Sequence, residues 1–337
     1  MSYYFQLPTF TQLTTNQKFA LGEDEAISLC GGPGTGKTVV SLWRHIRNHE
    51  LHGINSLLLT YTKTLQYYLI KTAEPNNKNA ASKIDRTIRW SNHNQKAGTH
   101  YDEIIIDEAQ DVNKERYQII KRLTDLVSFG ADDAQGVYKD GCTLNQLNNL
   151  FPQNEQYELA QNFRNSKEIL LFVQSVFPNI YIPNEVLKSA YISGLKPLIQ
   201  ILGRNNFEEL VVENILEIIE DFPDETHNIG ILVPSIKMVN TYFALLRANN
   251  NCSMYHSELE NFASLERIHI TTFKSAKGLE FDTVIIPGFD SFKWFINNTD
   301  TFSENDYHVA LTRSRRNLYL LCKYNINISS TNTYNKE

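Results

Sequence analysis

Residues 31–38 read GGPGTGKT and have the residue types and spacing that bind a chain of phosphates. Glycines let the main chain turn so tightly that successive N–H groups point at one anion, and the positive end of a following helix adds attraction. In this pattern Lys37 reaches the β- and γ-phosphate oxygens, and the Thr38 hydroxyl can bind Mg²⁺. The other cofactor contacts expected from this loop come from Gly32, Gly34, Thr35 and Gly36.

Two carboxylates, Asp107 and Glu108, follow an apolar run at residues 103–106. At the carboxyl end of a parallel strand such groups face the crevice where ligands bind. Asp107 would then hold Mg²⁺ through water, and Glu108 would polarise the attacking water. A solvated acidic loop is the alternative for this pair alone. Together with the loop at Lys37, the pair predicts hydrolysis of a nucleoside triphosphate.

Short apolar runs alternate with amphipathic stretches along the chain, which predicts parallel sheets covered by helices on both faces, an α/β fold. In the first half we expect strands at 26–29, 56–60, 103–106 and 126–130, with helices at 38–49 and 114–123. In the second half we expect strands at 197–202, 229–233, 267–272, 283–286 and 318–322, with helices at 207–219, 235–247 and 305–312. The predicted domains are 1–155 and 156–325, followed by a polar tail at 326–337.

Composition narrows the class of protein. The chain has 337 residues, of which 42% are hydrophobic and 21% charged, which is typical of globular domains and argues against a disordered or coiled-coil protein. The net charge of −6 excludes a polybasic coat but leaves room for a local basic groove. The apolar runs are far shorter than the roughly 18 residues that span a bilayer, and residues 1–10 do not form a secretory signal. We therefore expect a cytoplasmic protein without a membrane partner.

The sequence DEAQD at residues 107–111 resembles motif II of superfamily I helicases of the UvrD/Rep/PcrA type. Six other segments resemble further motifs of this family in the same order: 13–17, 59–62, 131–135, 159–164, 272–281 and 309–313. The resemblance extends over about residues 13–320. It implies two tandem RecA-like P-loop NTPase domains, each with a mainly parallel sheet flanked by helices, that use ATP and Mg²⁺ and bind single-stranded nucleic acid.

The resemblance also implies roles for individual residues. Gln17 would read the adenine edge, Phe163 would lie under the base, and Gln135 would sense the γ-phosphate. Arg164 and Arg313 would reach the γ-phosphate, a role that suits the permanent charge and planar fork of arginine. The implied cofactor contacts also include Gly278 and Glu280, and the implied nucleic-acid contacts are Tyr61 and Lys274. The alternatives are a surface salt bridge for either arginine, a core position for Phe163 and a solvated helix position for Gln17.

Three features depart from the family pattern. Only 39 positions separate Thr62 from Tyr101, and only 108 separate Arg164 from Thr272, so the large accessory insertions of UvrD-like motors are not expected. Asp140 stands where the family stacks an aromatic ring on a base, and Lys274 stands where the family usually has histidine. A carboxylate cannot stack and repels the phosphate chain. These departures predict weak single-strand binding and argue against processive unwinding.

Two hypotheses from different classes follow. The first is an ATP-hydrolysing superfamily I motor that acts on single-stranded nucleic acid, with DNA expected over RNA. In this hypothesis the function of gripping and unwinding a duplex is lost or is supplied by a protein partner. The alternative is a nucleotide-switched regulatory ATPase that controls a partner protein without unwinding, for example an effector nuclease of an anti-phage defence system. A small-molecule kinase would leave the later motifs unexplained.

Overall fold

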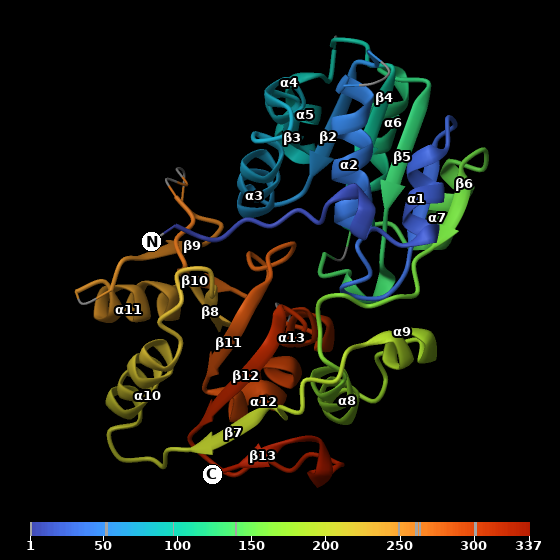
Figure 1. The fold of residues 1–337 in the computed structure, drawn as a ribbon. Coiled ribbons are helices and arrows are strands. Elements are labelled where there is room, and N and C mark those ends of the chain that lie inside the picture. The colour runs from blue at the N-terminus through green and yellow to red at the C-terminus, as the bar shows by residue number, and fades with distance from the viewer. Residues whose placement is uncertain are drawn as a thin grey trace. The chain divides into compact units, whose positions relative to one another are not determined.

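The computed structural model describes residues 2–50, 53–96, 98–138, 140–248, 250–259, 262, 264–299 and 302–337 (Figure 1). The chain forms two compact units. The first unit is Phe5–Gln161, and the second consists of Met1–Tyr4 together with Asn162–Glu337. The structure therefore divides the chain between Tyr4 and Phe5 and again between Gln161 and Asn162, whereas the sequence led us to expect one division, between residues 155 and 156.

The first unit is built on a six-stranded sheet with the order β3-β2-β4-β5-β1-β6, in which every pair of neighbours is parallel. Its strands are β1 (Ile27–Cys30), β2 (Ser56–Thr60), β3 (Ile84–Arg86), β4 (Glu103–Ile106), β5 (Leu126–Gly130) and β6 (Glu155–Glu158). The central strands are buried and mostly apolar, as expected for a parallel sheet that is covered on both faces.

Helices cover both faces of this sheet. They are α1 (Thr15–Gly22), α2 (Lys37–Glu50), α3 (Lys63–Ala73), α4 (Lys78–Ser82), α5 (Thr87–His93), α6 (Lys114–Arg122) and α7 (Leu144–Leu150), with short 3₁₀ turns at Phe10–Gln12, Ala109–Asp111 and Asp133–Gln135. Leu58 and Ile105 pack in one core cluster with residues of α2 and α3, whereas Ile104 and Ile106 pack in another with Tyr117 of α6. Figure 1 shows α2 in front of the sheet.

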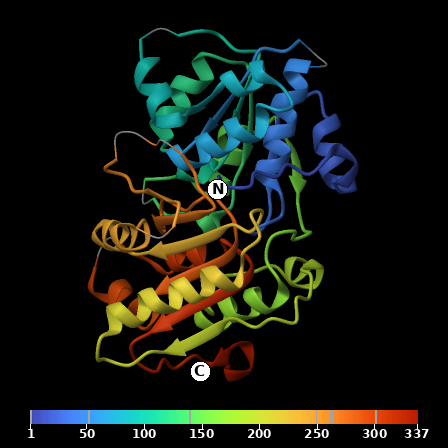
Figure 2. The ribbon, with the colours of Figure 1, turned by 60° about the vertical axis from the view of Figure 1, so that its left-hand side comes forward.

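The second unit has a seven-stranded, fully parallel sheet with the order β13-β7-β12-β11-β8-β10-β9. Its strands are β7 (Leu198–Ile201), β8 (Ile229–Val233), β9 (Cys252–Tyr255), β10 (Ile268–Thr272), β11 (Phe281–Pro287), β12 (Ser314–Cys322) and β13 (Asn335–Lys336). Its helices are α8 (Lys167–Val176), α9 (Asn184–Ser189), α10 (Phe207–Asp221), α11 (Ile236–Leu246), α12 (Phe292–Asn298) and α13 (Glu304–Leu311), with 3₁₀ turns at Phe289–Ser291 and Thr331–Thr333. Figure 2 shows α10, in yellow, lying over this sheet.

The predicted elements recur in the structure, and β2, β4, β5 and β8 have the predicted bounds. Four strands that the sequence did not reveal, β3, β6, β9 and β13, lie at the sheet edges. β6 reads Glu-Gln-Tyr-Glu and is largely exposed, and β13 lies in the segment expected as a polar tail. Among the described strands, each of these edge strands pairs with one neighbour only, and none contains a run of three apolar residues that would mark it in the sequence. Within the described part of the chain, no helix has both the length and the apolar character needed to cross a bilayer.

Candidate functional site

The loop at residues 31–36 joins β1 to α2 at the carboxyl edge of the first sheet. Glycine is required at two of its positions. A Cβ atom on Gly31, where φ is +142°, would lie 2.2 Å from the carbonyl oxygen of Leu159. A Cβ atom on Gly36, where φ is +89°, would lie 2.5 Å from Nε2 of Gln17. The loop therefore keeps a main-chain path that only glycine permits, as the phosphate-binding pattern predicted.

Lys37 lies at the start of α2 and is only 9% exposed. Its Nζ donates hydrogen bonds to the carbonyl oxygens of Gly31 and Gly32 at 2.7 and 2.9 Å. The same Nζ lies 3.5 Å from Oδ2 of Asp132, which also accepts a 2.6 Å hydrogen bond from Nε2 of Gln135. The ammonium group is thus held between the phosphate loop and the loop that follows β5.

Thr38 and Asp107 form a second link across this edge. The Thr38 hydroxyl donates to Oδ1 of Asp107 over 3.2 Å, which joins the start of α2 to the end of β4. Both groups carry hard oxygen atoms of the kind that Mg²⁺ prefers. The two residues assigned to the metal from sequence are therefore adjacent in the structure.

Glu108 follows Asp107 in a left-handed conformation, with φ of 57° and ψ of 45°. This conformation is uncommon for a residue with a side chain and tends to occur at functional sites. Oε2 of Glu108 accepts a 2.7 Å hydrogen bond from Nε2 of Gln110, whose Oε1 accepts a 3.2 Å hydrogen bond from the main-chain N–H of Asp132. Gln110 therefore connects the expected general base to the loop that holds Gln135.

Gln17 is buried against the phosphate loop. Its Nε2 donates to the carbonyl oxygen of Thr35 over 3.1 Å, and its Oε1 accepts from the N–H of Thr14, which caps α1. These contacts exclude the alternative of a solvated helix position. The first unit thus brings together nearly all the residues that the sequence assigned to it: Gln17, the loop from Gly32 to Thr38, Asp107, Glu108 and Gln135.

The second unit contains an arginine cluster around Glu280, the residue that directly precedes β11. Nε of Arg164 lies 2.9 Å from Oε2 of Glu280, and Nη1 of Arg315 lies 3.7 Å from Oε1. Burial acts to raise the pKa of the Glu280 carboxyl group, but Arg164 and Arg315 outweigh it and hold that pKa below its usual range. The sequence assigned Arg164 and Glu280 to the site but did not reveal Arg315.

Arg313 belongs to the same region of the second unit and is only 1% exposed. Its guanidinium group donates to the carbonyl oxygens of Val309 and Leu279 at 3.0 and 3.3 Å. Asn165 connects the segment around Arg313 to the Arg164 loop. Its Nδ2 donates to the carbonyl oxygens of Thr312 and Ser314 at 2.9 and 2.7 Å. Asn165 is another contact that sequence reasoning missed. Neither arginine is an isolated surface salt bridge.

The two other second-unit residues assigned to the cofactor are close in sequence to the arginine cluster: Phe163 precedes Arg164, and Gly278 lies two residues before Glu280. The ring of Phe163 is 42% exposed, so it is not a core aromatic. Gly278 has a φ of +84°, which gives the segment between β10 and β11 a turn that favours glycine.

Both residues assigned to nucleic acid contact other side chains in the structure. The ring centroid of Tyr61 lies 4.4 Å from that of Tyr138, and burial, with a contribution from the charge of Asp111, raises the pKa of Tyr61 to about 12. Nζ of Lys274 lies 3.9 Å from Oδ1 of Asp306, and burial raises the pKa of this aspartate above its ordinary value. In the loop after Tyr138, position 139 lies outside the described residues and position 140 is exposed.

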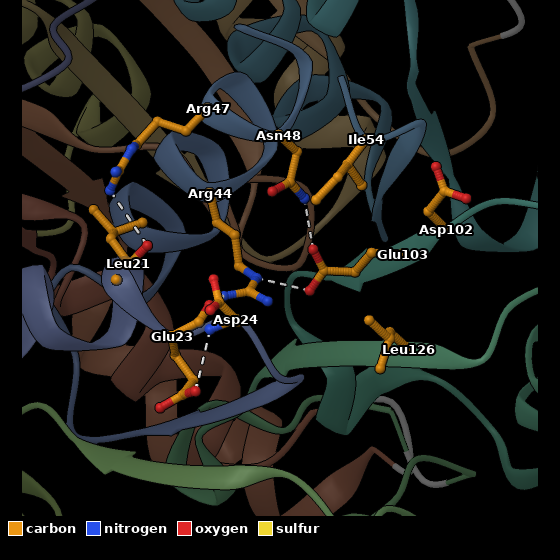
Figure 3. Close-up of a pocket in the computed structure, with 11 residues that line it drawn as sticks. Leu21, Glu23, Asp24, Arg44, Arg47, Asn48, Ile54, Asp102, Glu103 and Leu126 are labelled. Atoms are coloured by element: carbon orange, nitrogen blue, oxygen red, sulfur yellow. Dashed lines mark hydrogen bonds and ion pairs between the residues drawn. The ribbon is translucent and has the colours of Figure 1, made fainter. Parts of the chain in front are cut away.

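A pocket at the opposite, amino-terminal edge of the first sheet has a different character (Figure 3). Its volume of about 130 Å³ is below the roughly 300 Å³ at which ligand pockets begin. Glu103 accepts hydrogen bonds there from Nε of Arg44 at 2.7 Å and from Nδ2 of Asn48 at 2.6 Å. Arg44 also donates to the carbonyl oxygens of Glu23 and Glu25, both at 2.8 Å. This arrangement is a closed hydrogen-bond network rather than a binding site.

Comparison with known families gives the identity of the chain. A family model described as the DNA/RNA helicase domain of Schlafen group 3 matches residues 25–221, more than half of the chain. The chain belongs to this helicase family. A second model, the UvrD-like helicase C-terminal domain, matches residues 235–324. The resemblance to UvrD/Rep-like superfamily I helicases that the motifs indicated is therefore confirmed.

Two relatives carry helicase names. A protein of Acanthamoeba polyphaga mimivirus named as an ATP-dependent DNA helicase is 26% identical over 250 residues, which cover 66% of this chain and 34% of that protein. The ATP-dependent DNA helicase srs2 of Schizosaccharomyces pombe is 31% identical over 150 residues, which cover 41% of this chain and 17% of that protein. The matched regions thus span about a third or less of each relative.

Among solved structures, Dbp5 of S. cerevisiae, determined with bound RNA, ADP and BeF3, matches with a TM-score of 0.58 and 11% identity. The match covers 93% of this chain and 84% of the Dbp5 chain. At this identity the match concerns the fold alone. It confirms the predicted fold class of two tandem RecA-like α/β domains, each with a parallel sheet flanked by helices.

Proposed function

We propose that this helicase-family chain hydrolyses ATP with Mg²⁺ and uses the reaction to move along single-stranded nucleic acid, with DNA as the preferred form. The observation that carries the proposal is the meeting of Lys37, Thr38, Asp107, Glu108 and Gln135 at one edge of one sheet. These residues come from three separate stretches of the sequence. Phosphate binding, metal binding and water activation each have a residue of the appropriate chemistry among them.

The residues present fit a nucleotide and its metal. The glycine-dependent loop supports main-chain contacts to the phosphates, and Lys37 would exchange its carbonyl partners for β- and γ-phosphate oxygens. Thr38 and Asp107 would hold Mg²⁺, which needs few protein ligands when phosphates and water supply the rest. When bound, the metal would neutralise charge that develops on the phosphate oxygens.

Hydrolysis requires a base for the attacking water. Glu108 would accept a proton from that water while the water oxygen forms a bond to the γ-phosphorus. The bond between the γ-phosphorus and the β,γ-bridging oxygen would break, and that oxygen would leave with ADP. Gln110 would keep the Glu108 carboxylate oriented through its 2.7 Å hydrogen bond. Arg164 and Arg313 would stabilise charge on the γ-phosphate in the transition state, and Phe163 would lie under the base.

Nucleic-acid binding is proposed to be weak and dependent on salt. The net charge is −6, and Asp140 is an exposed carboxylate where a stacking ring would add affinity. A missing base–aromatic stack lowers affinity by about ten- to a hundred-fold. Tyr61 and Lys274 would contribute to the strand groove. The preference for DNA rests on the names of the two sequence relatives.

A second candidate function is a nucleotide-switched ATPase that controls a partner protein. One observation favours it: Tyr61 is packed against Tyr138 and Lys274 is paired with Asp306, so both expected nucleic-acid residues are already engaged. In this alternative, ATP-driven rearrangement would change contacts with the partner rather than grip a strand.

Steady-state ATP turnover with and without oligonucleotides separates the two candidates. We expect turnover to require Mg²⁺ and to rise severalfold or more with single-stranded DNA, with a smaller response to single-stranded RNA. Lys37→Ala, prepared identically, controls for contaminating ATPase. Turnover that ignores both nucleic acids at low salt would contradict the motor and favour the partner-controlled switch.

A further inference from the structure

The segment Ser2–Tyr4 belongs to the second unit, although the whole first unit separates it in sequence from the rest of that unit. Ser2 forms an antiparallel bridge with Glu266, and the N–H of Tyr3 donates to the carbonyl oxygen of Leu265 over 2.9 Å. Asn228 holds the main chain of Tyr4 from both sides, accepting from its N–H at 2.9 Å and donating to its carbonyl oxygen at 3.0 Å. We refer to residues Ser2–Tyr4 as the strap.

Only the Tyr3 side chain of the strap is buried, at 3% exposure, whereas that of Tyr4 is 46% exposed. The Tyr3 hydroxyl donates to the main-chain carbonyl oxygen of Glu280. Its ring packs edge-on against Phe281, with centroids 5.9 Å apart. The strap therefore contacts the chain at Glu280 and at the residue that follows it.

Glu280 is the residue on which the arginine cluster depends. Its carboxylate binds Arg164 at 2.9 Å and lies 3.7 Å from Arg315. The N–H of Phe281 donates to the carbonyl oxygen of Arg313 over 2.9 Å. Glu280 lies in the irregular segment between β10 and β11, directly before the first residue of β11. The Tyr3 hydroxyl supplies a contact that holds the main chain of Glu280.

We propose that Tyr3 is a positioning residue for the arginine cluster: it fixes the main chain of Glu280 and thereby the orientation of the Arg164 guanidinium group. The inference rests on the proposed ATP hydrolysis, in which Arg164 acts on the transition state. Misdirection of Arg164 lowers turnover more than ATP affinity, because charge on the γ-phosphate grows as the reaction proceeds. A strap that only stabilised the fold would change the melting temperature and leave turnover per folded molecule unchanged.

Tyr3→Phe tests the proposal because it removes only the hydroxyl. Tyr4→Phe is the matched control, since the strap uses the main chain of Tyr4 and leaves its side chain exposed. For Tyr3→Phe we expect kcat to fall about three- to tenfold, the size of one lost hydrogen bond, with KM for ATP within about twofold. Amide hydrogen exchange should become faster at residues 279–283. Tyr4→Phe should match the parent in every measurement.

The possible outcomes are distinguishable. A parental kcat for Tyr3→Phe, with Arg164→Ala strongly impaired, would overturn the strap inference and leave the proposed function standing. If the unmodified chain hydrolyses no ATP, the proposed function fails and hydrogen exchange decides the inference. Faster exchange at 279–283 in Tyr3→Phe but not in Tyr4→Phe would then support the positioning of Glu280, and unchanged exchange would overturn it.

Discussion

The two edges of the β1–β6 sheet each carry a buried cluster of charged and polar side chains, and α2 contributes to both. The carboxyl-end cluster contains Lys37, Asp107, Glu108, Gln110, Asp132 and Gln135. The amino-end cluster contains Arg44, Asn48, Glu103 and Ser128, and part of it is seen in Figure 3. Helix α2 begins with Lys37 at one edge and presents Arg44 and Asn48 at the other.

The two clusters differ in the pairing of their side chains and in the conformation of the main chain that carries them. At the amino end, Glu103 accepts from three side chains, and Arg44 divides its donors between that carboxylate and two main-chain carbonyl groups. At the carboxyl end, Glu108 has a left-handed backbone and the adjoining loop depends on glycine. Backbone strain of this kind is typical of functional sites, whereas matched networks hold a fold together. On the proposed function, the carboxyl-end cluster performs the chemistry and the amino-end cluster stabilises the fold.

The largest expected effect is that of Lys37→Ala. The substitution should reduce ATP hydrolysis to background and weaken nucleotide binding, because it removes the β/γ-phosphate contact from the ground state and the transition state alike. Turnover assays and nucleotide titration measure both effects. The free energy of unfolding should change far less than in the next variant, and an equal loss of stability would erase the contrast between the clusters.

Glu103→Gln should have the opposite pattern, with a large loss of stability and little change in ATP turnover. Replacing the carboxylate leaves the buried Arg44 without its charged partner, which typically costs about 3–5 kcal/mol of folding free energy. Urea unfolding measures the loss, and ATP turnover per folded molecule should remain near that of the parent. If turnover fell while stability was kept, the amino-end cluster would have to be reassigned to the site.

The sequence predicted one cluster better than the other, and the reason is physical. The carboxyl-end residues belong to short motifs in which local spacing already implies phosphate or metal chemistry, so Lys37, Thr38 and Glu108 could be assigned without a structure. The partners Asp132 and Gln110 were missed as individual residues because their contacts exist only once β4 and β5 are neighbours.

The amino-end network and the strap have no motif at all. Arg44 and Glu103 are 59 positions apart, and the strap meets Glu280 after 277 positions. Charge and residue type alone cannot predict which of many carboxylates an arginine will contact over such separations. The edge strand β6 was missed for a related reason, since its four residues include no apolar run.

In the second unit, Arg164→Ala should lower kcat about 10²-fold with a smaller effect on KM for ATP, as expected for charge stabilisation in the transition state. Arg164→Lys should restore little, because a point charge does not reproduce the planar fork. Arg313→Ala should lower turnover similarly and should also lower the melting temperature, since Arg313 is buried and bonded to main-chain carbonyl groups. A fully active Arg164→Lys variant would place this residue outside the site.

The smallest effect concerns His45, a buried residue of α2 between Ser56 and the carbonyl oxygen of Ala80. Burial lowers its pKa to about 3. Below about pH 6.5 the His45 side chain binds a proton in the unfolded chain but stays neutral in the folded chain. The free energy of unfolding therefore falls as the pH decreases from about 6.5 toward 3. At pH 5.5 the loss from one such histidine is about 1.4 kcal/mol.

His45→Gln should remove this contribution. Urea unfolding of the first unit at pH 7.5 and 5.5 should show a difference smaller than that of the parent by about 1.4 kcal/mol. His269 in the second unit, whose pKa burial also lowers to about 3, is untouched and serves as the internal comparison. An unchanged pH difference would mean that His45 is protonated in the folded chain.

The most direct test of the account is ATP turnover by Glu108→Gln at saturating Mg²⁺ and ATP with single-stranded DNA present. Glutamine keeps the shape of the side chain but cannot accept the proton of the attacking water. The account predicts that the variant binds ATP with near-parental affinity, keeps the unfolding free energy of the parent and turns over at least about 10²-fold more slowly. Hydrolysis at the parental rate would contradict the assignment of Glu108 as the general base, and with it the division of labour between the two edges of the sheet.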